Sequence, residues 1–262
     1  MRLLNRNVIL TLQKLQYLSA LSIRLTKITG KSKYPIHPKH LIKKTPWYLK
    51  YLSAKDIVLD MGCGLGQHSI NISPKVKKVV AFDISSKIIE IASRRASDEK
   101  IKNIRFEAVN AEKSFPYIDN FFSSVLCLDV LEHLKNQNLA MREIRRVLKP
   151  KGKLFLSLPN RETSWKKLQA SVGLFYYSDY DHKREYTKGE IEKLCRKYNF
   201  EVKFVRPVVL DMPLAPVFDL IGGFSLTVYK KLLEWKKRKV LKNPQESVGF
   251  QIYAINQKPV AV

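Results

Sequence analysis

The chain has 262 residues, of which 45% are hydrophobic, and a formal net charge of +25. This length is enough for one large domain, or one domain with a smaller cap, around a sizeable hydrophobic core. The three cysteines stand far apart in the sequence, which argues against a structural zinc site and favours a reducing, cytoplasmic location.

The positive charge of this basic protein is unevenly distributed. Residues 1–55 hold twelve Lys and Arg and no acidic residue, residues 56–160 hold seventeen against twelve, and residues 161–262 hold nineteen against eleven. The excess therefore lies mostly in the flanks, which indicates contact with a polyanionic surface, either acidic lipid or RNA. A Lys-rich surface that contacts only solvent is the alternative interpretation.

Apolar residues recur in residues 1–30 at mostly helical spacing, with Arg and Lys between them. This pattern predicts one amphipathic helix that ends at Gly30. Gln13 and Lys14 interrupt the apolar run, so we expect neither a secretory signal nor a membrane span. We expect residues 1–50 to form a basic amphipathic cap that packs on the domain, and whose helix lies on a membrane or closes the active site.

Residues 57–66 are the most informative stretch of the chain. A buried strand ends on Asp60, and a loop with Gly62, Gly64 and Gly66 leads into a helix. Glycines at this spacing let bare peptide groups approach a ligand closely, and the helix N-terminus adds free N–H groups. The spacing is not that of a dinucleotide fingerprint or a P-loop. An acidic residue just before the loop suits a ligand with an ammonium group, such as S-adenosylmethionine.

A second strand, residues 78–82, ends at Asp83, 21 residues beyond Gly62. A carboxylate at this distance in an α/β nucleotide fold accepts hydrogen bonds from the ribose hydroxyls. The alternative is that Asp83 caps the helix predicted over residues 85–96. We favour the ribose contact. Further strands are predicted at residues 104–109, 124–128, 153–158, 201–209 and 249–256.

Five motifs then occur in a fixed order over residues 55–160: VLDMGCGLG, VVAFD, NAEKSFPYIDNFF, DVLEHL and LKPKGKLFLSLPN. Together they resemble the class I S-adenosylmethionine-dependent methyltransferases, and most closely the small-molecule and lipid branch that includes quinone-biosynthesis enzymes. The resemblance implies methyl transfer (EC 2.1.1.-) and an α/β fold with a doubly wound, seven-stranded, mostly parallel sheet whose last strand is antiparallel. It implies these cofactor-binding residues: Asp60, Gly62, Gly64, Gly66, Asp83, Ile84, Asn110, Ala111 and Leu128.

Asp129, Glu132 and His133 follow the fourth strand. Asp followed by Glu three residues later is typical of a capping box, and we expect Asp129 to cap a helix here. The functional interpretation places Glu132 and His133 beside the transferred methyl group, with His133 as a general base. Some related quinone O-methyltransferases hold a divalent ion with a similar group, but we expect no metal in this protein.

After residue 160 the predictions concern the acceptor. Residues 182–190 contain the H-x-R-x-Y-T-x-x-E arrangement that is usual in the same branch, which implies that His182 and Arg184 contact the substrate. The alternative is that His182 and Arg184 are surface residues of a lid loop. Thr187 and Glu190 form a capping box that opens a helix.

An insertion at residues 208–245 combines an apolar half with a basic half that contains Trp235, which is the composition of an interfacial anchor. We therefore predict a core over residues 51–160 and a lid with the C-terminal part over residues 161–262. The expected activity is methyl transfer to an O-, C- or N-atom of a small or lipophilic acceptor, with peripheral membrane contact through residues 1–30 and 208–242. An RNA methyltransferase and a non-catalytic cofactor-binding protein are the alternatives.

Overall fold

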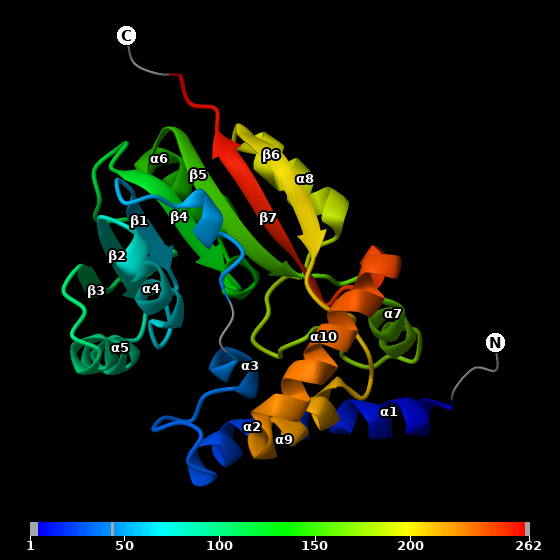
Figure 1. Ribbon diagram of the computed structural model, residues 1–262. Helices are drawn as coiled ribbons and strands as arrows, with labels where there is room; N and C mark the ends of the chain where they lie inside the picture. The colour runs from blue at the N-terminus through cyan, green and yellow to red at the C-terminus, as the bar shows by residue number, and fades with distance from the viewer. Residues whose placement is uncertain (1–4, 43–44, 260–262) are drawn as a thin grey trace. The chain divides into compact units, whose positions relative to one another are not determined.

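A computed structural model describes residues 5–42 and 45–259 (Figure 1). Contacts within the chain divide it into two compact units. The helical unit consists of Met1–Lys44, Asn160–Ser178 and Pro207–Gly249, and the sheet unit consists of Thr45–Pro159, Asp179–Arg206 and Phe250–Val262.

The sheet unit contains seven strands in the order β3-β2-β1-β4-β5-β7-β6. The strands are β1 (Ile57–Met61), β2 (Lys78–Asp83), β3 (Ile104–Ala108), β4 (Phe122–Leu128), β5 (Leu148–Pro159), β6 (Phe200–Pro207) and β7 (Gly249–Asn256). The pairs among β1 to β5 are parallel, whereas β7 runs against its neighbours (Figure 1). The predicted doubly wound, mostly parallel sheet with an antiparallel last strand is confirmed.

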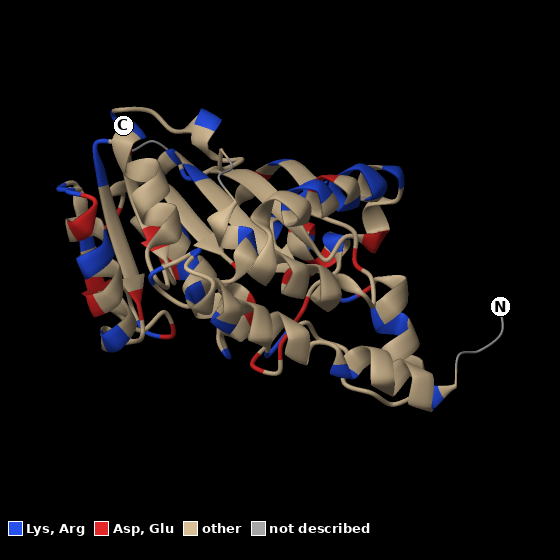
Figure 2. Cartoon of the chain, turned by 60° about the horizontal axis from the view of Figure 1, so that its bottom comes forward, with Lys and Arg blue, Asp and Glu red and all other residues tan. Residues whose placement is uncertain are grey.

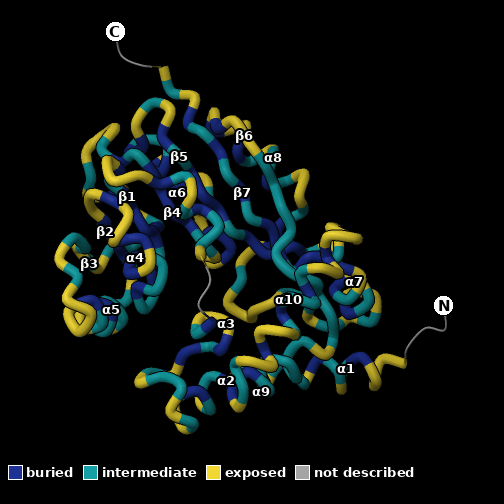
Figure 3. Tube along the Cα trace, in the orientation of Figure 1, coloured by how far each residue is buried: buried dark blue, intermediate teal, exposed yellow. Residues whose placement is uncertain are grey.

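Successive residues of each buried strand face opposite sides of the sheet, so the strands contribute to two apolar clusters. Leu59 and Met61 of β1 belong to one cluster with residues of α6 (Gln137–Val147) and α8 (Lys188–Lys197). Val58, on the other face, belongs to a second cluster with residues of α4 (Gln67–Ile72) and of the 3-10 turn η1 (Leu49–Tyr51). Buried residues accordingly follow the central strands in Figure 3. The remaining helix of this unit is α5 (Ser86–Asp98), and the shorter 3-10 turns are η2 (Ser73–Lys75) and η3 (Leu131–His133).

The helical unit contains α1 (Arg6–Lys14), α2 (Tyr17–Ile28), α3 (Pro38–Leu41), α7 (Ser164–Ser171), α9 (Ala215–Phe224), α10 (Leu226–Lys242) and the 3-10 turn η4 (Pro244–Glu246). Two glycines let α9 approach its neighbours closely. A Cβ atom on Gly223 would lie 2.8 Å from Cβ of Leu25 in α2, and one on Gly222 would lie 2.7 Å from Cβ of Pro38. Any larger residue would therefore force these helices apart.

A partly buried carboxylate joins the same helices. Asp219 of α9 accepts hydrogen bonds from Ser19 Oγ (2.6 Å) and from the hydroxyl of Tyr229 (2.7 Å), and lies 3.4 Å from Nε2 of His37. Burial alone would raise the pKa of Asp219. The interactions with His37, followed by the hydrogen bonds from Ser19 and Tyr229, outweigh it and lower the pKa to about 2.

Two local predictions differ from the structure. The single helix expected over residues 1–30 is two helices, because the amide N–H groups of Leu15 and Gln16 bond to carbonyls only three residues back, which interrupts the α-helical pattern. Strand β5 begins at Leu148 rather than at Lys153, and its register with β4 shifts between Phe122 and Ser124. Within the described ranges, no helix is both long and apolar enough to cross a membrane.

Candidate active site

The glycine loop follows β1 at the edge where the parallel strands end. Gly62, Gly64 and Gly66 all have positive φ, at 66°, 50° and 74°. A Cβ atom at Gly62 would lie 2.5 Å from Val130, and one at Gly66 would lie 2.9 Å from the ring of Phe106. At Gly64, by contrast, no atom lies within 4 Å of such a Cβ position. The outer glycines therefore serve packing, and the middle one leaves open space for a ligand.

Two carboxylates flank this loop. Asp60 is only 2% exposed and accepts a hydrogen bond from Ser69 Oγ (2.5 Å). Burial, which is the largest effect, raises the pKa of Asp60. Asp83, at the end of β2, accepts hydrogen bonds from the backbone N–H groups of Gly64 and Ser85, both at 3.1 Å. Helix α5 is capped by Ser85, not by Asp83, so the capping alternative for Asp83 is excluded.

The other predicted cofactor residues lie at the same edge. Asp83 pairs with Ala108 of β3, and Val109 N–H donates to the carbonyl of Asp83 (2.9 Å), which brings Asn110 beside the end of β2. Ile84, the residue after β2, is 70% exposed. The remaining predicted residues are Asn110, whose Oδ1 accepts from Glu112 N–H (2.8 Å), the buried Ala111, and Leu128 at the end of β4.

Three neighbours of the loop were not predicted. Arg95 of α5 donates to the carbonyl of Leu65 and to Oε1 of Gln67, and so holds the loop in place. The hydroxyl of Tyr48 lies 2.6 Å from Nδ1 of His68, and both side chains interact electrostatically with Asp60. These contacts join residues 20 to 30 positions apart, for which the sequence contains no spacing signal.

These residues fit S-adenosylmethionine. A buried carboxylate at Asp60 with one oxygen bonded to Ser69 suits the ammonium group of the methionine part, because a nearby cation relieves the cost of burying negative charge. Asp83 would hold the ribose, and the exposed side chain of Ile84 would contact the adenine. The open space at Gly64 is where a larger side chain would obstruct the ligand.

The predicted helix cap after β4 is wrong. Asp129 has φ of 57° and accepts a hydrogen bond from Ser157 Oγ (2.7 Å). Residues 131–133 form only the 3-10 turn η3, which has no side-chain cap, and α6 begins later with Asn136 as its cap. The left-handed backbone at Asp129 turns the chain sharply, which presents the following residues at the strand edge.

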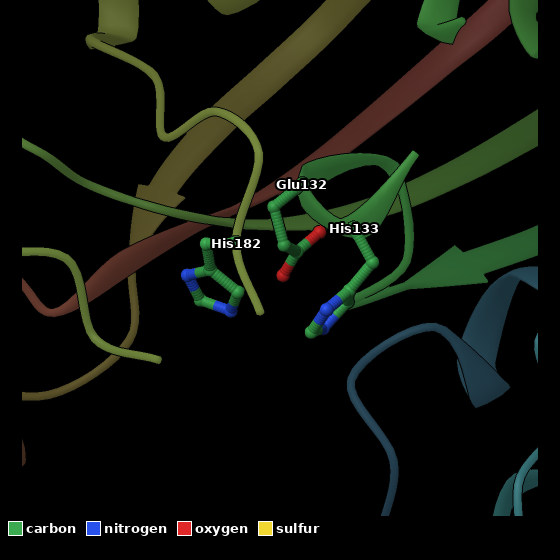
Figure 4. Close-up of side chains that lie close together, drawn as sticks. All are labelled: Glu132, His133 and His182. Carbon is green, nitrogen blue, oxygen red and sulfur yellow. The ribbon is translucent and has the colours of Figure 1, made fainter. Parts of the chain in front are cut away.

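Glu132 and His133 of this turn meet His182 from the loop before α8 (Figure 4). One ligating atom from each of the three side chains lies within 4.8 Å of the others. The two imidazole rings meet edge to face, with centroids 4.7 Å apart. The sequence predicted a role for each residue, and the fold brings together positions that are about 50 residues apart.

Main-chain contacts fasten the His182 loop to the turn. The N–H groups of Lys183 and Arg184 both donate to the carbonyl of Glu132, at 2.7 and 3.2 Å. The ring itself is oriented by Glu185, whose fully buried carboxylate lies 2.8 Å from Nδ1 of His182. Because Nδ1 is engaged, Nε2 is the nitrogen left for a ligand. Glu185 was not predicted, and only its position three residues after His182 could have indicated it.

The surroundings favour the neutral form of His133, although the residue is exposed. Partial desolvation and then the neighbouring His182 lower its pKa below the ordinary 6.5, against the opposing effect of Asp179, Asp181 and Asp129. A neutral imidazole at neutral pH can accept a proton.

The side chain of Arg184 has partners outside this cluster. Its guanidinium pairs with Glu190 (3.0 Å) and lies over the ring of Tyr186, 5.2 Å from the centroid. Glu190 also completes the predicted capping box with Thr187, which is confirmed at the start of α8. The expected contact between Arg184 and an anionic group of the acceptor stays a prediction.

A sheet that changes strand order between β1 and β4, with a glycine loop at that point, defines the Rossmann-like class of cofactor-binding proteins. Comparison with known proteins narrows the class. A family model described as "Methyltransferase domain" matches residues 52–208, and the chain belongs to this family. S-adenosylmethionine is accordingly its cofactor.

Individual relatives agree with this assignment. The ubiquinone biosynthesis O-methyltransferase of Xanthomonas axonopodis pv. citri is 28% identical over 227 residues, which cover 84% of this chain and 86% of that protein. The uncharacterized methyltransferase YcgJ of Bacillus subtilis is 34% identical over 103 residues, 39% of this chain and 40% of YcgJ. The chain spans about half the length, or less, of several of the curated relatives that it matches.

Solved structures show the same fold at low identity. The crystal structure of YcgJ has a TM-score of 0.58 and 21% identity, and covers 80% of this chain and 97% of its own. A SAM-dependent methyltransferase from Methanosarcina mazei has a TM-score of 0.58 and 19% identity, and covers 83% of this chain and 100% of its own.

Proposed function

We propose that this protein transfers the methyl group of S-adenosylmethionine to a hydroxyl oxygen of a small, lipophilic acceptor. The observation that carries the proposal is the cluster of Glu132, His133 and His182, which lies after β4, the strand next to the glycine loop of β1. The ubiquinone biosynthesis O-methyltransferase similar over most of the chain favours an oxygen acceptor and a lipophilic molecule.

The cluster supplies what transfer to a hydroxyl needs. Displacement at a sulfonium methyl group requires an aligned nucleophile and exclusion of water. His133 is neutral at pH 7 and takes the hydroxyl proton as the oxygen attacks, so that positive charge moves onto the imidazole. The nearby carboxylate of Glu132 stabilises that charge, and His182, oriented by Glu185, holds the acceptor by hydrogen bonding.

The same side chains offer two imidazoles and a carboxylate, which is a donor set that divalent transition metals accept. Metal-free transfer is the sequence prediction, and metal-assisted transfer is the second candidate that this geometry favours. Activity that survives extensive treatment with EDTA supports the first. Activity lost with EDTA and restored by one divalent ion supports the second.

The test of the main proposal is transfer of label from S-adenosylmethionine to three acceptors: phenols with alkyl chains of increasing length, a total lipid extract, and total RNA. Label in the phenols or lipids, reduced about a hundredfold by His133→Gln, is the expected result. The Asp83→Ala variant should lose cofactor binding and serves as the inactive control. Label in RNA, or bound cofactor with no transfer to any of the three acceptors, would contradict the proposal.

The proposal includes peripheral contact with a membrane through the two segments predicted for it, residues 1–30 and 208–242. A lipophilic acceptor resides in the bilayer, so an enzyme at its surface meets a higher concentration of it. The basic charge of the flanks supports this location.

A further inference from the structure

Basic charge is concentrated in the helical unit. Its sequence holds twenty Lys and Arg against five Asp and Glu, whereas the sheet unit holds twenty-eight against eighteen. Helix α10 alone contributes seven basic residues and one acid. Lys and Arg follow one another along this helix in Figure 2. A helix of this composition attracts a negatively charged surface.

One face of α10 is occupied by the fold, because residues three and four positions apart lie on the same side of a helix. The buried residues of α10 are Tyr229, Leu233, Lys236 and Val240. Tyr229 and Leu233 form a small apolar cluster with Ile42, and Phe218 of α9 packs against it. The other faces of α10 are therefore not part of this buried contact.

A second side of α10 borders an apolar groove of about 380 Å³. The residues that line the groove are Phe218, Val228, Lys231, Leu232 and Trp235. The rings of Phe218 and Trp235 meet with centroids 6.2 Å apart, and the ammonium group of Lys239 lies 5.9 Å from the centroid of Trp235. Lys231, Arg238 and Lys242 follow on the exposed side. Apolar and cationic stripes thus run along the helix next to each other.

Exposed apolar side chains continue this surface at the helix ends. Ile28 is 77% exposed, Phe224 60% and Val228 46%. These side chains come from helix ends that lie next to each other. Thr29 Oγ1, just after α2, donates to the carbonyl of Gly223 near the end of α9 (3.0 Å), and α10 begins two residues after α9 ends. Grouped exposed apolar residues of this kind mark an interaction surface.

We propose that these features form one docking face, consisting of Ile28, Phe224, the groove beside Trp235 and the cations of α10, and that it binds the surface of an anionic phospholipid bilayer. The apolar side chains enter the boundary between headgroups and acyl chains, and the ammonium and guanidinium groups contact lipid phosphates. This inference specifies the membrane contact of the proposed function, but it does not depend on methyl transfer.

The chemistry of the docking face favours a bilayer over two other occupants. RNA would engage the cations but would leave Ile28 and Phe224 in water. A second copy of the chain would cover the apolar residues but would bring two strongly basic helices together, which costs free energy through repulsion. Of these three occupants, only an anionic bilayer satisfies both the apolar and the cationic groups.

The first test is flotation of the full chain with vesicles of phosphatidylcholine, with and without phosphatidylglycerol, in the absence of S-adenosylmethionine. We expect binding only with the anionic lipid. Each basic residue near such a surface strengthens binding about fivefold, so Lys231→Gln, Arg238→Gln and Lys242→Gln together should weaken it roughly a hundredfold. A matched triple variant in the sheet unit, with Gln at exposed Lys75, Lys78 and Lys102, should weaken it far less.

The second test removes apolar contacts. Ile28→Ser with Phe224→Ser should weaken binding to the anionic vesicles about tenfold or more, because two exposed side chains no longer enter the bilayer. Ile118→Ser, at a 72% exposed position of the sheet unit, is the matched control. Lipids brominated in their acyl chains should quench the wild-type fluorescence, and Trp235→Phe should remove most of that quenching.

Several outcomes would overturn the inference: no flotation with either vesicle, equal binding by wild type and both docking-face variants, or unchanged quenching in Trp235→Phe. Retention of RNA without vesicle binding would assign the cations to nucleic acid instead. Self-association that disappears in the Ile28→Ser, Phe224→Ser variant, again without vesicle binding, would assign the face to a dimer. Because no methyl donor is present, these results are independent of whether the transfer assay succeeds.

Discussion

Substitution of Gly64 by Ala should separate stability from cofactor binding. The position has φ of 50°, and a Cβ atom there would contact nothing within 4 Å. The only cost to the fold is the left-handed backbone of an L-residue, about 1–2 kcal/mol. At roughly 2–4 °C per kcal/mol for a chain of about this size, the melting temperature should fall by a few degrees. The new methyl group would nevertheless occupy the space opened for the ligand.

Gly30 provides a matched control in the helical unit. It has φ of 68° and equally open surroundings, so Gly30→Ala introduces the same backbone strain away from the glycine loop. Gly66→Ala provides the opposite comparison, because its Cβ would lie 2.9 Å from the Phe106 ring and add about 1–3 kcal/mol of overpacking. Without ligand, the Gly30→Ala and Gly64→Ala variants should therefore have equal melting temperatures, and the Gly66→Ala variant should melt at a lower temperature than both.

The assay is thermal unfolding with and without S-adenosylmethionine. A ligand at 100 times its dissociation constant stabilises the folded state by about 2.7 kcal/mol, which should raise the melting temperature of the wild type and of Gly30→Ala by several degrees. In Gly64→Ala this rise should be small or absent. A full ligand-induced rise in Gly64→Ala, or a loss of stability far greater than that of Gly30→Ala, would refute the assignment of open space at Gly64 to the cofactor.

Three further predictions concern protonation and positioning. With EDTA-treated enzyme, the rate of methyl transfer should be constant at neutral pH and decline only below pH 6.5, because His133 must be neutral to accept a proton and its pKa is lowered. The His133→Gln variant should have a kcat about a hundredfold lower, and its kcat should no longer decline below pH 6.5. Glu185→Gln should lower kcat and leave the KM for S-adenosylmethionine unchanged, since the carboxylate orients His182 rather than the cofactor; a changed cofactor KM with normal kcat would contradict this role. Asp219 has a folded pKa of about 2, below the ordinary 3.8, so it contributes about 2 kcal/mol of stability above pH 4 that is lost as the pH falls through 2; urea titrations should show this loss in the wild type and not in Asp219→Asn.

The sequence predicted the features that depend on local pattern. The glycine loop, the carboxylate of Asp83 and the capping box at Thr187 all lie within short segments whose residue types and spacing determine their geometry. The family motifs extended this to the doubly wound sheet of seven strands with an antiparallel last strand, because parallel strands joined by helices allow few arrangements.

Other features depend on distant contacts and could not be predicted. Glu185 is an ordinary acidic residue in the sequence and becomes the partner of His182 only when its loop is buried. The pair of Tyr48 and His68 joins segments on either side of β1. Asp129 has the sequence of a helix cap, but its bond to Ser157 of β5 favours a left-handed turn instead. In each case, tertiary contacts override the local preference.

The attachment of the His182 loop has a consequence for changing the acceptor by engineering. The loop is tied to the carbonyl of Glu132 by the backbone N–H groups of residues 183 and 184, so the side chains at these positions are not part of the tie. Any residue except proline can provide those donors. Loops grafted from relatives should therefore keep the imidazole in register if they retain His182, Glu185 and non-proline residues between them. Under the proposed function, acceptor preference can then diversify at these positions while the arrangement of Glu132 and His182 is retained.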